Sequence, residues 1–330
     1  MAVKIKHFIG IDVSKEKIDC VLLKDSILIG HKVVSNDLNS ITNYLNAFRQ
    51  LKGYSIQNTL FCMEETGIYT DILKRVLEKI RAKFVIENAY HIKTSLGIKR
   101  AKTDELDAYH IALYAYKNRD HLKVYSSKRP ILETLQHLES LRTRLMSIRV
   151  VLDNPLGEQK KYFTKSQYQD QLALTHDCRN SIIKGYESVN KKIEEIMSRD
   201  LLLSHLMFIV TSVTGIGPVT ARHIIISTNE FKKINDPRKY ACYAGVAPFK
   251  RSSGNIEYKS KISKIANQKV KSLLTMCAMS AIKTDADLKD YYIRKTTVDG
   301  KSKLSVINAV RYKLILRVFA CVKHDRKYVR

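Results

Sequence analysis

The order of apolar segments in the first third of the chain limits its fold more than any other feature. Short apolar or alternating runs, which are typical of strands, are separated by segments with helical spacing. The expected strands are 7–13, 17–23, 26–34, 59–63 and 83–86, and the expected helices are 40–51, 70–80 and 106–117. Three strands followed by alternating helices and strands predict an α/β domain.

The middle of the chain is expected to be helical. Leucine and isoleucine recur at three- and four-residue steps from 135 to 152, and a second series runs from 182 to 196. Between them, Asn154, Pro155 and Gly157 are expected to interrupt the helix. Two such series predict an antiparallel helical hairpin or coiled coil, which commonly spaces domains or mediates oligomerisation.

From about residue 205 the chain is expected to be mostly helical. The run Val213-Thr214-Gly215-Ile216-Gly217-Pro218 is typical of a helix-hairpin-helix turn, in which Gly215 and Gly217 would let a phosphate approach backbone N–H groups. An ordinary tight connection between helices is the alternative. The sequence thus predicts three domains, 1–125, 126–204 and 205–330, and the first has the element order of an RNase H-like domain.

The charge of the chain indicates its partner. Lysine and arginine number 58 against 32 acidic residues, which gives a net charge of +26, and there are 18 tyrosines. The basic excess is concentrated in the last third of the sequence. A generally basic proteome could produce such a charge, but a nucleic acid partner explains it better, because lysine and arginine neutralise phosphates and tyrosine stacks on bases.

Several classes of protein are excluded by what the sequence lacks. The six cysteines form no CxxC pair and no zinc-finger spacing, so they are expected to be reduced thiols rather than metal ligands. No apolar run approaches the roughly 20 residues that span a membrane. The start of the chain leads directly into a predicted strand and is not typical of a signal peptide. We therefore expect a cytoplasmic protein without a membrane partner.

Four carboxylates form the first candidate site. Asp12 lies inside an apolar strand, where an acid is costly unless it is paired or metal-bound. Glu64 ends another strand, and Glu65 beside it should face the opposite side. Asp104 and Asp107 share one face at a helix start, where acids also suit the helix dipole, which is the structural alternative for this pair.

The chemistry of phosphodiester exchange explains such a set of acids. Mg²⁺, or Mn²⁺ in its place, prefers oxygen ligands. Two ions about 4 Å apart can stabilise the attacking and the leaving oxygen atoms. Asp12, Glu64, Asp104 and Asp107 are therefore predicted to be both metal ligands and catalytic residues.

A serine in a basic segment forms the second candidate site. Ser252-Ser253-Gly254 follows Lys250 and Arg251 and precedes Lys261 and Lys264. Basic neighbours could bind a phosphate and assist attack by a hydroxyl group. A solvated turn is the plainer interpretation of this segment taken alone.

Here the sequence resembles a known family over nearly its whole length. It is similar to the DEDD insertion-sequence transposases, family one-ten, which are bridge-RNA-guided recombinases related to the Piv-type DNA invertases. The matching elements, in the family's order, are Gly10-Ile11-Asp12, Glu64-Glu65-Thr66-Gly67-Ile68-Tyr69, Lys102-Thr103-Asp104-Glu105-Leu106-Asp107-Ala108, Gly215-Ile216-Gly217, Ala244-Gly245-Val246-Ala247-Pro248, Ser253-Gly254 and Ile262-Ser263-Lys264-Ile265-Ala266-Asn267.

The resemblance implies roles for individual residues and parts of the chain. Its patterns select Glu64 over Glu65 and Ser253 over Ser252, and imply that Ser253 attacks DNA to form a phosphoserine-type intermediate. They also imply a RuvC-like domain, a coiled-coil spacer and a transposase domain, with acids and serine from different protomers of a tetramer. The candidate nucleic-acid contacts are Lys102, Gly215, Gly217, Lys250, Arg251, Lys261 and Lys264.

The resemblance further implies the partners: double-stranded donor and target DNA, a structured guide RNA encoded beside the gene, and one to three further copies of the chain at the nucleoid. The sequence departs from many relatives after Ser253-Gly254, where it continues Asn255-Ile256-Glu257-Tyr258, so contacts around the serine are expected to differ. The basic end of the chain, 323–330, is expected to contact nucleic acid.

The residues by themselves leave three other functions open. A RuvC-type nuclease would use the acids and metal ions with water as the nucleophile. An actin-like or sugar-kinase-like phosphotransferase could use 10–14 as a phosphate loop, but the sequence shows no second glycine-rich loop. A non-catalytic protein that binds RNA or DNA would need neither the acids nor the serine.

Overall fold

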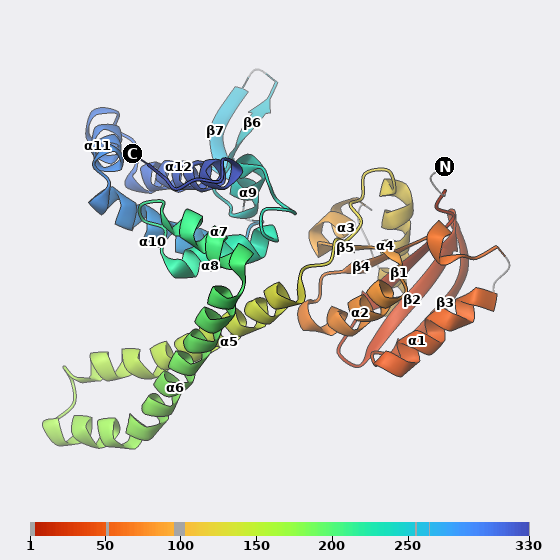
Figure 1. Cartoon of the computed structure of the whole chain (residues 1–330), viewed down its shortest axis with the longest axis horizontal. Coiled ribbons are helices and arrows are strands. Elements are labelled where there is room, and N and C mark those ends of the chain that lie inside the picture. Colours follow the sequence, from red (N-terminus) through yellow and green to blue (C-terminus); the bar gives the residue numbers. More distant parts are fainter. Residues whose placement is uncertain (1–3, 51–52, 96–102, 255, 264, 330) are drawn as a thin grey trace. The chain divides into compact units, whose positions relative to one another are not determined.

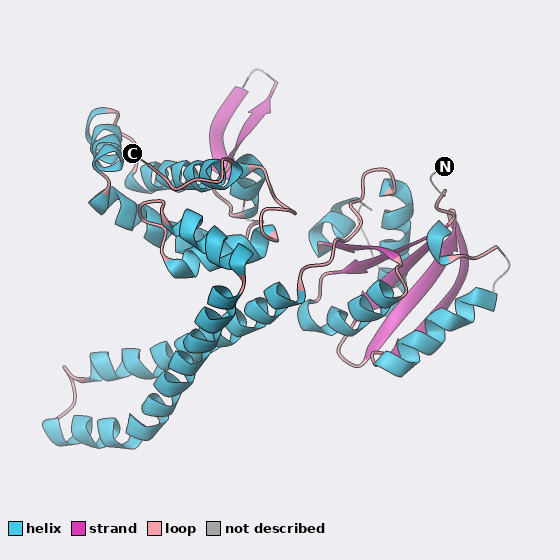
Figure 2. Cartoon of the chain, viewed as in Figure 1, coloured by secondary structure: helices cyan, strands magenta, loops and turns pink. Residues whose placement is uncertain are grey.

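The structure is a computed structural model that describes residues 4–50, 53–95, 103–254, 256–263 and 265–329. The chain divides into two compact units, Met1–Ser127 and Lys128–Arg330. The first unit is mixed α/β and the second is almost entirely helical (Figures 1 and 2). Lys102 and Lys264, two of the predicted nucleic-acid contacts, lie outside the described residues, as does the side chain of Arg251.

The first unit is built on a five-stranded sheet with the order β3-β2-β1-β4-β5. The strands are β1 (His7–Val13), β2 (Lys17–Lys24), β3 (Ile27–Ser35), β4 (Thr59–Glu64) and β5 (Lys83–Glu87). The first three strands pair antiparallel, and β4 and β5 run parallel to β1. All five strands expected from the sequence are therefore present, within one or two residues of their predicted bounds.

Helices cover both faces of this sheet because the strands alternate two sets of apolar side chains. Ile9, Ile11 and their neighbours pack against α1 (Leu38–Ala47) and α2 (Asp71–Lys79). Phe8 and the residues aligned with it pack on the other face against α4 (Asp104–Asn118). The shorter helices of this unit are η1 (Phe48–Gln50), η2 (Ile56–Asn58), η3 (Gly67–Thr70) and α3 (Ala89–Ser95).

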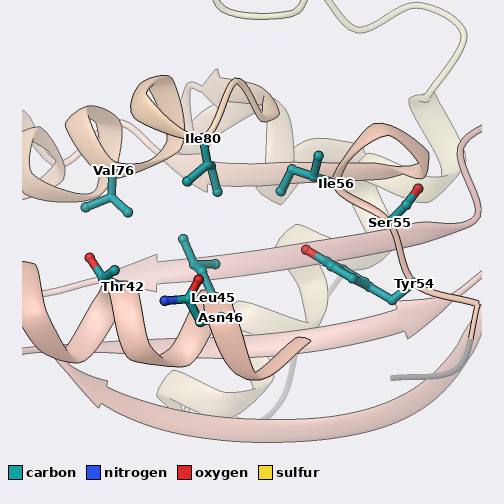
Figure 3. Close-up of a pocket in the computed structure, with 8 residues that line it drawn as sticks. All are labelled: Thr42, Leu45, Asn46, Tyr54, Ser55, Ile56, Val76 and Ile80. Atoms are coloured by element: carbon teal, nitrogen blue, oxygen red, sulfur yellow. The ribbon is translucent and has the colours of Figure 1, made fainter. Parts of the chain in front are cut away.

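A cavity of about 190 Å³ lies on the α1 and α2 side of the sheet, where the segment Tyr54–Ile56 closes one end of it (Figure 3). Leu45 and Val76 line its walls together with a few polar side chains. This is the face opposite the one that α4 covers, so the cavity is separated by the sheet from the predicted acidic site.

The second unit begins with two long helices, α5 (Pro130–Gln159) and α6 (Lys165–Arg199), which form a helical hairpin. The predicted interruption at 154–157 is wrong, because α5 continues through Pro155 and the chain turns only at 160–164. Packing against α6 explains the difference: Leu156 is buried, and Asp153 pairs across the hairpin with Arg179 at 2.8 Å. These tertiary contacts outweigh the local cost of proline in a helix.

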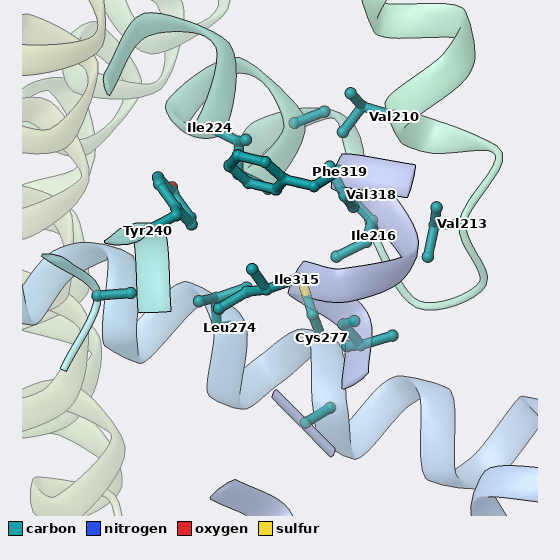
Figure 4. Close-up of a cluster of buried hydrophobic side chains, with 14 of the residues drawn as sticks. Val210, Val213, Ile216, Ile224, Tyr240, Leu274, Cys277, Ile315, Val318 and Phe319 are labelled. Carbon is teal, nitrogen blue, oxygen red and sulfur yellow. The ribbon is translucent and has the colours of Figure 1, made fainter. Parts of the chain in front are cut away.

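The rest of the second unit is a helical bundle. Its helices are α7 (Leu201–Thr211), α8 (Pro218–Thr228), α9 (Pro237–Tyr243), α10 (Gln268–Thr284), α11 (Ala286–Ile293), η4 (Arg294–Val298) and α12 (Lys303–Lys323). Their core gathers around Tyr240, Leu274 and Phe319 (Figure 4). A second cluster, which includes Leu135 and Ile193, packs the base of the hairpin against α7 and α8.

One element of this unit was not predicted from the sequence. The segment that carries the candidate serine forms a two-stranded antiparallel hairpin of β6 (Pro248–Ser253) and β7 (Ile256–Ile262). The basic residues in it hid the strand pattern, because they break the expected alternation of apolar and polar positions.

The described part of the chain contains no helix that is long and apolar enough to cross a membrane. All six cysteines are free: four are buried, whereas Cys178 and Cys242 are exposed. The expectation of unpaired thiols therefore agrees with the structure.

Candidate active site

Side-chain alternation places Asp12 and Glu64 on the same face of the sheet. In β1, Phe8 and Gly10 face α4, and Asp12 follows in the same alternation. In β4, Leu60 and Cys62 also face α4, so Glu64 shares that side. Glu65 lies beyond the end of β4. Glu64 therefore lies on the same face of the sheet as Asp12.

Asp104 and Asp107 lie in the first turn of α4, as the sequence predicted. The helix begins there because the Thr103 hydroxyl accepts a hydrogen bond from the Leu106 backbone N–H at 3.2 Å. Because α4 covers the face of the sheet that carries Asp12, the first turn of α4 places Asp104 and Asp107 near the end of β1.

The electrostatics of Asp12 indicate that these acids converge. Its pKa is raised to about 6, first by burial and then by the negative charges of neighbouring acids, in the order Asp107, Asp104, Glu64 and Asp19. Each neighbouring carboxylate makes ionisation of Asp12 less favourable. The structure therefore brings Glu64, Asp104 and Asp107 within electrostatic reach of Asp12.

Asp19 and Lys17 belong to the same cluster, and the sequence analysis missed them. Asp19 is the cross-strand partner of Asp12 in the β1–β2 pair, and its side chain is only 5% exposed. The ammonium group of Lys17 contacts Asp19 at 3.1 Å and Asp104 at 2.8 Å, and His31 Nε2 lies 2.9 Å from the other Asp19 oxygen. The sequence did carry a signal, since Asp19, like Asp12, is an acid inside an apolar strand.

The fit of the cluster to a divalent metal rests on its charge. Among the residues that the structure describes, no three acidic, histidine or cysteine side chains are close enough to hold one ion as they stand. The cluster nevertheless concentrates oxygen ligands and negative charge, and the Lys17 ammonium group occupies the position of a cation against Asp104 and Asp19. Oxygen donors that already attract a cation suit Mg²⁺ or Mn²⁺.

Ser253 lies in the second unit at the tip of the β6–β7 hairpin. It is the last residue of β6 and pairs with Ile256, and the turn is closed by Gly254, whose φ of +55° favours glycine. The Ser253 side chain is exposed, as are Lys250 and Lys261 on the same hairpin. An exposed hydroxyl group among basic side chains is accessible to a nucleic acid backbone.

The turn at 213–218 connects α7 and α8, and its two glycines have different surroundings. Gly215 has a φ of +91°, and a side chain there would meet the carbonyl oxygen of Cys277 in α10 at 2.7 Å. Close packing within the bundle is thus a structural reason for Gly215. Gly217 faces open space and precedes Pro218, the first residue of α8. Gly217 is exposed, but its backbone N–H donates to the Cys277 thiol inside the bundle.

Comparison with known proteins agrees with the resemblance seen in the sequence. A transposase family model of the DEDD type matches residues 9–159, and the model of the Transposase IS116/IS110/IS902 family matches residues 207–293. The pilin gene-inverting proteins of Moraxella bovis and Moraxella lacunata are each 24% identical to this chain, across 98% of both sequences. The two family models lie in the same order as the acidic and serine segments, and the chain belongs to the IS110 family of transposases, enzymes that cut and rearrange DNA.

Proposed function

We propose that this protein is a DNA recombinase of an insertion sequence, in which Ser253 is the nucleophile and the acidic cluster binds divalent metal ions. The convergence of Glu64, Asp104 and Asp107 on Asp12 carries this proposal. Carboxylates repel one another, so a divalent cation bound among them would stabilise a site that gathers them.

The architecture of the first unit supports an RNase H-like, specifically RuvC-like, catalytic domain. A mixed sheet with the order 3-2-1-4-5 carries Asp12 on the central strand and Glu64 at the end of the neighbouring strand. Bound Mg²⁺ or Mn²⁺ would neutralise charge on the phosphate during exchange. Asp12, Glu64, Asp104 and Asp107 would hold the ions, and Asp19 adds a further negative charge.

The exposed hairpin supports the role of Ser253. Its hydroxyl oxygen would attack a DNA phosphorus as its proton leaves, and the displaced deoxyribose oxygen would take up a proton. The result is a phosphoserine ester, which a strand hydroxyl from the second DNA would attack to restore the serine. Lys250 and Lys261 would attract the phosphate backbone to this tip.

The partners follow from the charge and from the two separate sites. The net charge of +26 suits donor and target DNA together with a structured guide RNA at the nucleoid. The acids and the serine lie in different units of the chain, which suits an assembly of two to four copies, in which one copy could supply the acids and another the serine.

A RuvC-type nuclease is the second candidate, because the acidic cluster by itself contains what water-mediated hydrolysis requires. The two functions differ in one product: the recombinase forms a covalent bond between protein and DNA, whereas the nuclease does not. A denaturing gel of interrupted reactions, followed by mass spectrometry of the labelled peptide, separates them.

The proposal is tested with Ser253→Ala, with Ser252→Ala as the matched control on the same strand. We expect Ser253→Ala to abolish strand exchange and the protein–DNA adduct while DNA binding remains, and Ser252→Ala to retain all three. The assay follows recombination of the DNA that flanks the gene, in the presence of RNA transcribed from the same locus. Recombination by purified Ser253→Ala protein would refute the assignment of the nucleophile.

A further inference from the structure

Arg311 in α12 is a buried cation without a carboxylate partner. Arg311 is only 8% exposed. Its Nε atom is buried and has no hydrogen-bond partner, whereas Nη1 donates to the side chain of Asn308 at 3.1 Å. No described residue forms an ion pair with it, and burial alone lowers its pKa. The residues outside the described ranges include no aspartate or glutamate that could serve as one.

Other arginines in this unit show how unusual this is. Arg142 and Arg222, which are also buried, both pair with the buried carboxylate of Glu139. Arg317, six residues along α12 from Arg311, pairs with Asp285 at 2.8 Å. An unpaired buried charge destabilises a fold, and an apolar side chain of similar volume in its place is often more stable. Arg311 is therefore costly to the ligand-free fold.

The surroundings of Arg311 connect it to the hairpin that carries the candidate nucleophile. Asn308, its one hydrogen-bond partner, donates from Nδ2 to the backbone oxygen of Val246 at 2.8 Å. Val246 is fully buried, and the chain enters β6 two residues later at Pro248. The guanidinium group is thus linked through Asn308 to the foot of the β6–β7 hairpin.

We propose that Arg311 binds a phosphodiester group of the DNA strand that Ser253 attacks, an inference that rests on the function proposed above. The guanidinium group is planar and suits two hydrogen bonds to one phosphate. Asn308 accepts a hydrogen bond from Nη1, while the buried Nε atom, which belongs to the other side of the group, has no protein partner. A bound phosphate supplies the missing negative charge.

The length of β6 separates the foot of the hairpin from Ser253. The strand from Pro248 to Ser253 spans about 17 Å at the usual rise of a β-strand. Because Arg311 is linked to the foot of the hairpin and Ser253 lies at its tip, the phosphate at Arg311 is a different one from the phosphate that Ser253 attacks. Arg311 is therefore a positioning residue, which fixes the register of the strand without touching the reacting atoms.

The test compares Arg311→Met with Arg317→Met, a matched control on the same helix. The full-length proteins are titrated into labelled duplex DNA and, separately, into a labelled structured RNA, at several salt concentrations. For Arg311→Met we expect DNA affinity to fall about tenfold and the salt dependence to lose about one ion. We expect its melting temperature without nucleic acid to stay equal or rise by about 2–4 °C.

Arg317→Met should behave in the opposite way, with DNA affinity retained and a lower melting temperature, because the buried carboxylate of Asp285 loses its ion pair with Arg317. Arg311→Lys, which keeps the charge but loses the fork, should recover part of the affinity. Unchanged DNA affinity in Arg311→Met, or a melting temperature as low as that of Arg317→Met, would overturn the proposal. A loss confined to RNA would overturn the assignment to DNA, and a wild-type protein that does not bind DNA would refute the proposed function as well.

Discussion

Gly10 in β1 contacts the backbone of Ala108 in α4 directly. A methyl group on Gly10 would lie 2.2 Å from the Ala108 carbonyl oxygen, well inside any real contact distance. Asp12 lies two residues beyond Gly10, and Asp107 lies one residue before Ala108. The absence of a side chain at position 10 is thus what lets the strand and the helix bring their acids together.

Gly10→Ala should therefore separate α4 from the sheet and disperse the acidic cluster. Overpacking of this kind costs about 1–3 kcal/mol or more, so we expect a lower melting temperature and weaker binding of Mn²⁺. Gly30→Ala is the control, because a side chain at Gly30 in β3 would meet nothing within 4 Å. A melting temperature of Gly10→Ala equal to that of the wild type would show that α4 does not pack this closely.

Lys17 should compete with divalent ions for the acidic cluster. Its ammonium group contacts Asp104 and Asp19, so Lys17→Met should bind Mn²⁺ several-fold more tightly than the wild type in an electron paramagnetic resonance titration. Lys15→Met, which changes an exposed lysine on the same turn, should not alter the affinity. Equal or weaker Mn²⁺ binding by Lys17→Met would contradict a competing role for this lysine.

Glu139 should be the most sensitive carboxylate of the second unit. It is 2% exposed and accepts from Arg142 Nε at 2.8 Å and from Arg222 Nε at 2.6 Å. Glu139→Ala leaves both buried cations without a carboxylate, and we expect a loss of about 3–5 kcal/mol, measured as the shift of the unfolding midpoint in urea. Glu195→Ala, which breaks a partly exposed pair with Lys192, should cost less than about 1 kcal/mol.

His223 should make the second unit less stable in mild acid. Burial, and then the positive charge of Lys269, lowers the pKa of His223 from 6.5 to about 4, although the negative charge of Glu139 acts to raise it. Because the unfolded chain takes up a proton near pH 6.5 and the folded protein does not, stability is fully present above pH 6.5. It is lost as the pH falls toward 4, by about 3 kcal/mol.

The measurement for His223 is the melting temperature as a function of pH. In His223→Gln this dependence should be smaller, because glutamine does not titrate. Melting curves of the two proteins that shift in parallel between pH 7 and pH 4 would contradict the lowered pKa.

Much of the first unit could be predicted because strand alternation is a local property. An acid at Asp12 or Glu64 must face the same side as every second residue of its own strand, whatever the rest of the chain does. Local pattern failed at Pro155, where contacts between α5 and α6 keep the helix intact, and at β6, where basic residues obscure the strand. In both segments the partner across the pair decides the structure.

By itself the sequence determined the family, the order of the elements in the first unit and the candidate acids and serine, because these depend on residue types and spacing along the chain. Only the tertiary structure decided that Asp19 and Lys17 join the acids, that Gly215 packs against α10 and that Arg311 is buried without a carboxylate. The physical reason is that burial and ion pairing depend on which elements meet in space, and residue spacing within one element does not specify its neighbour.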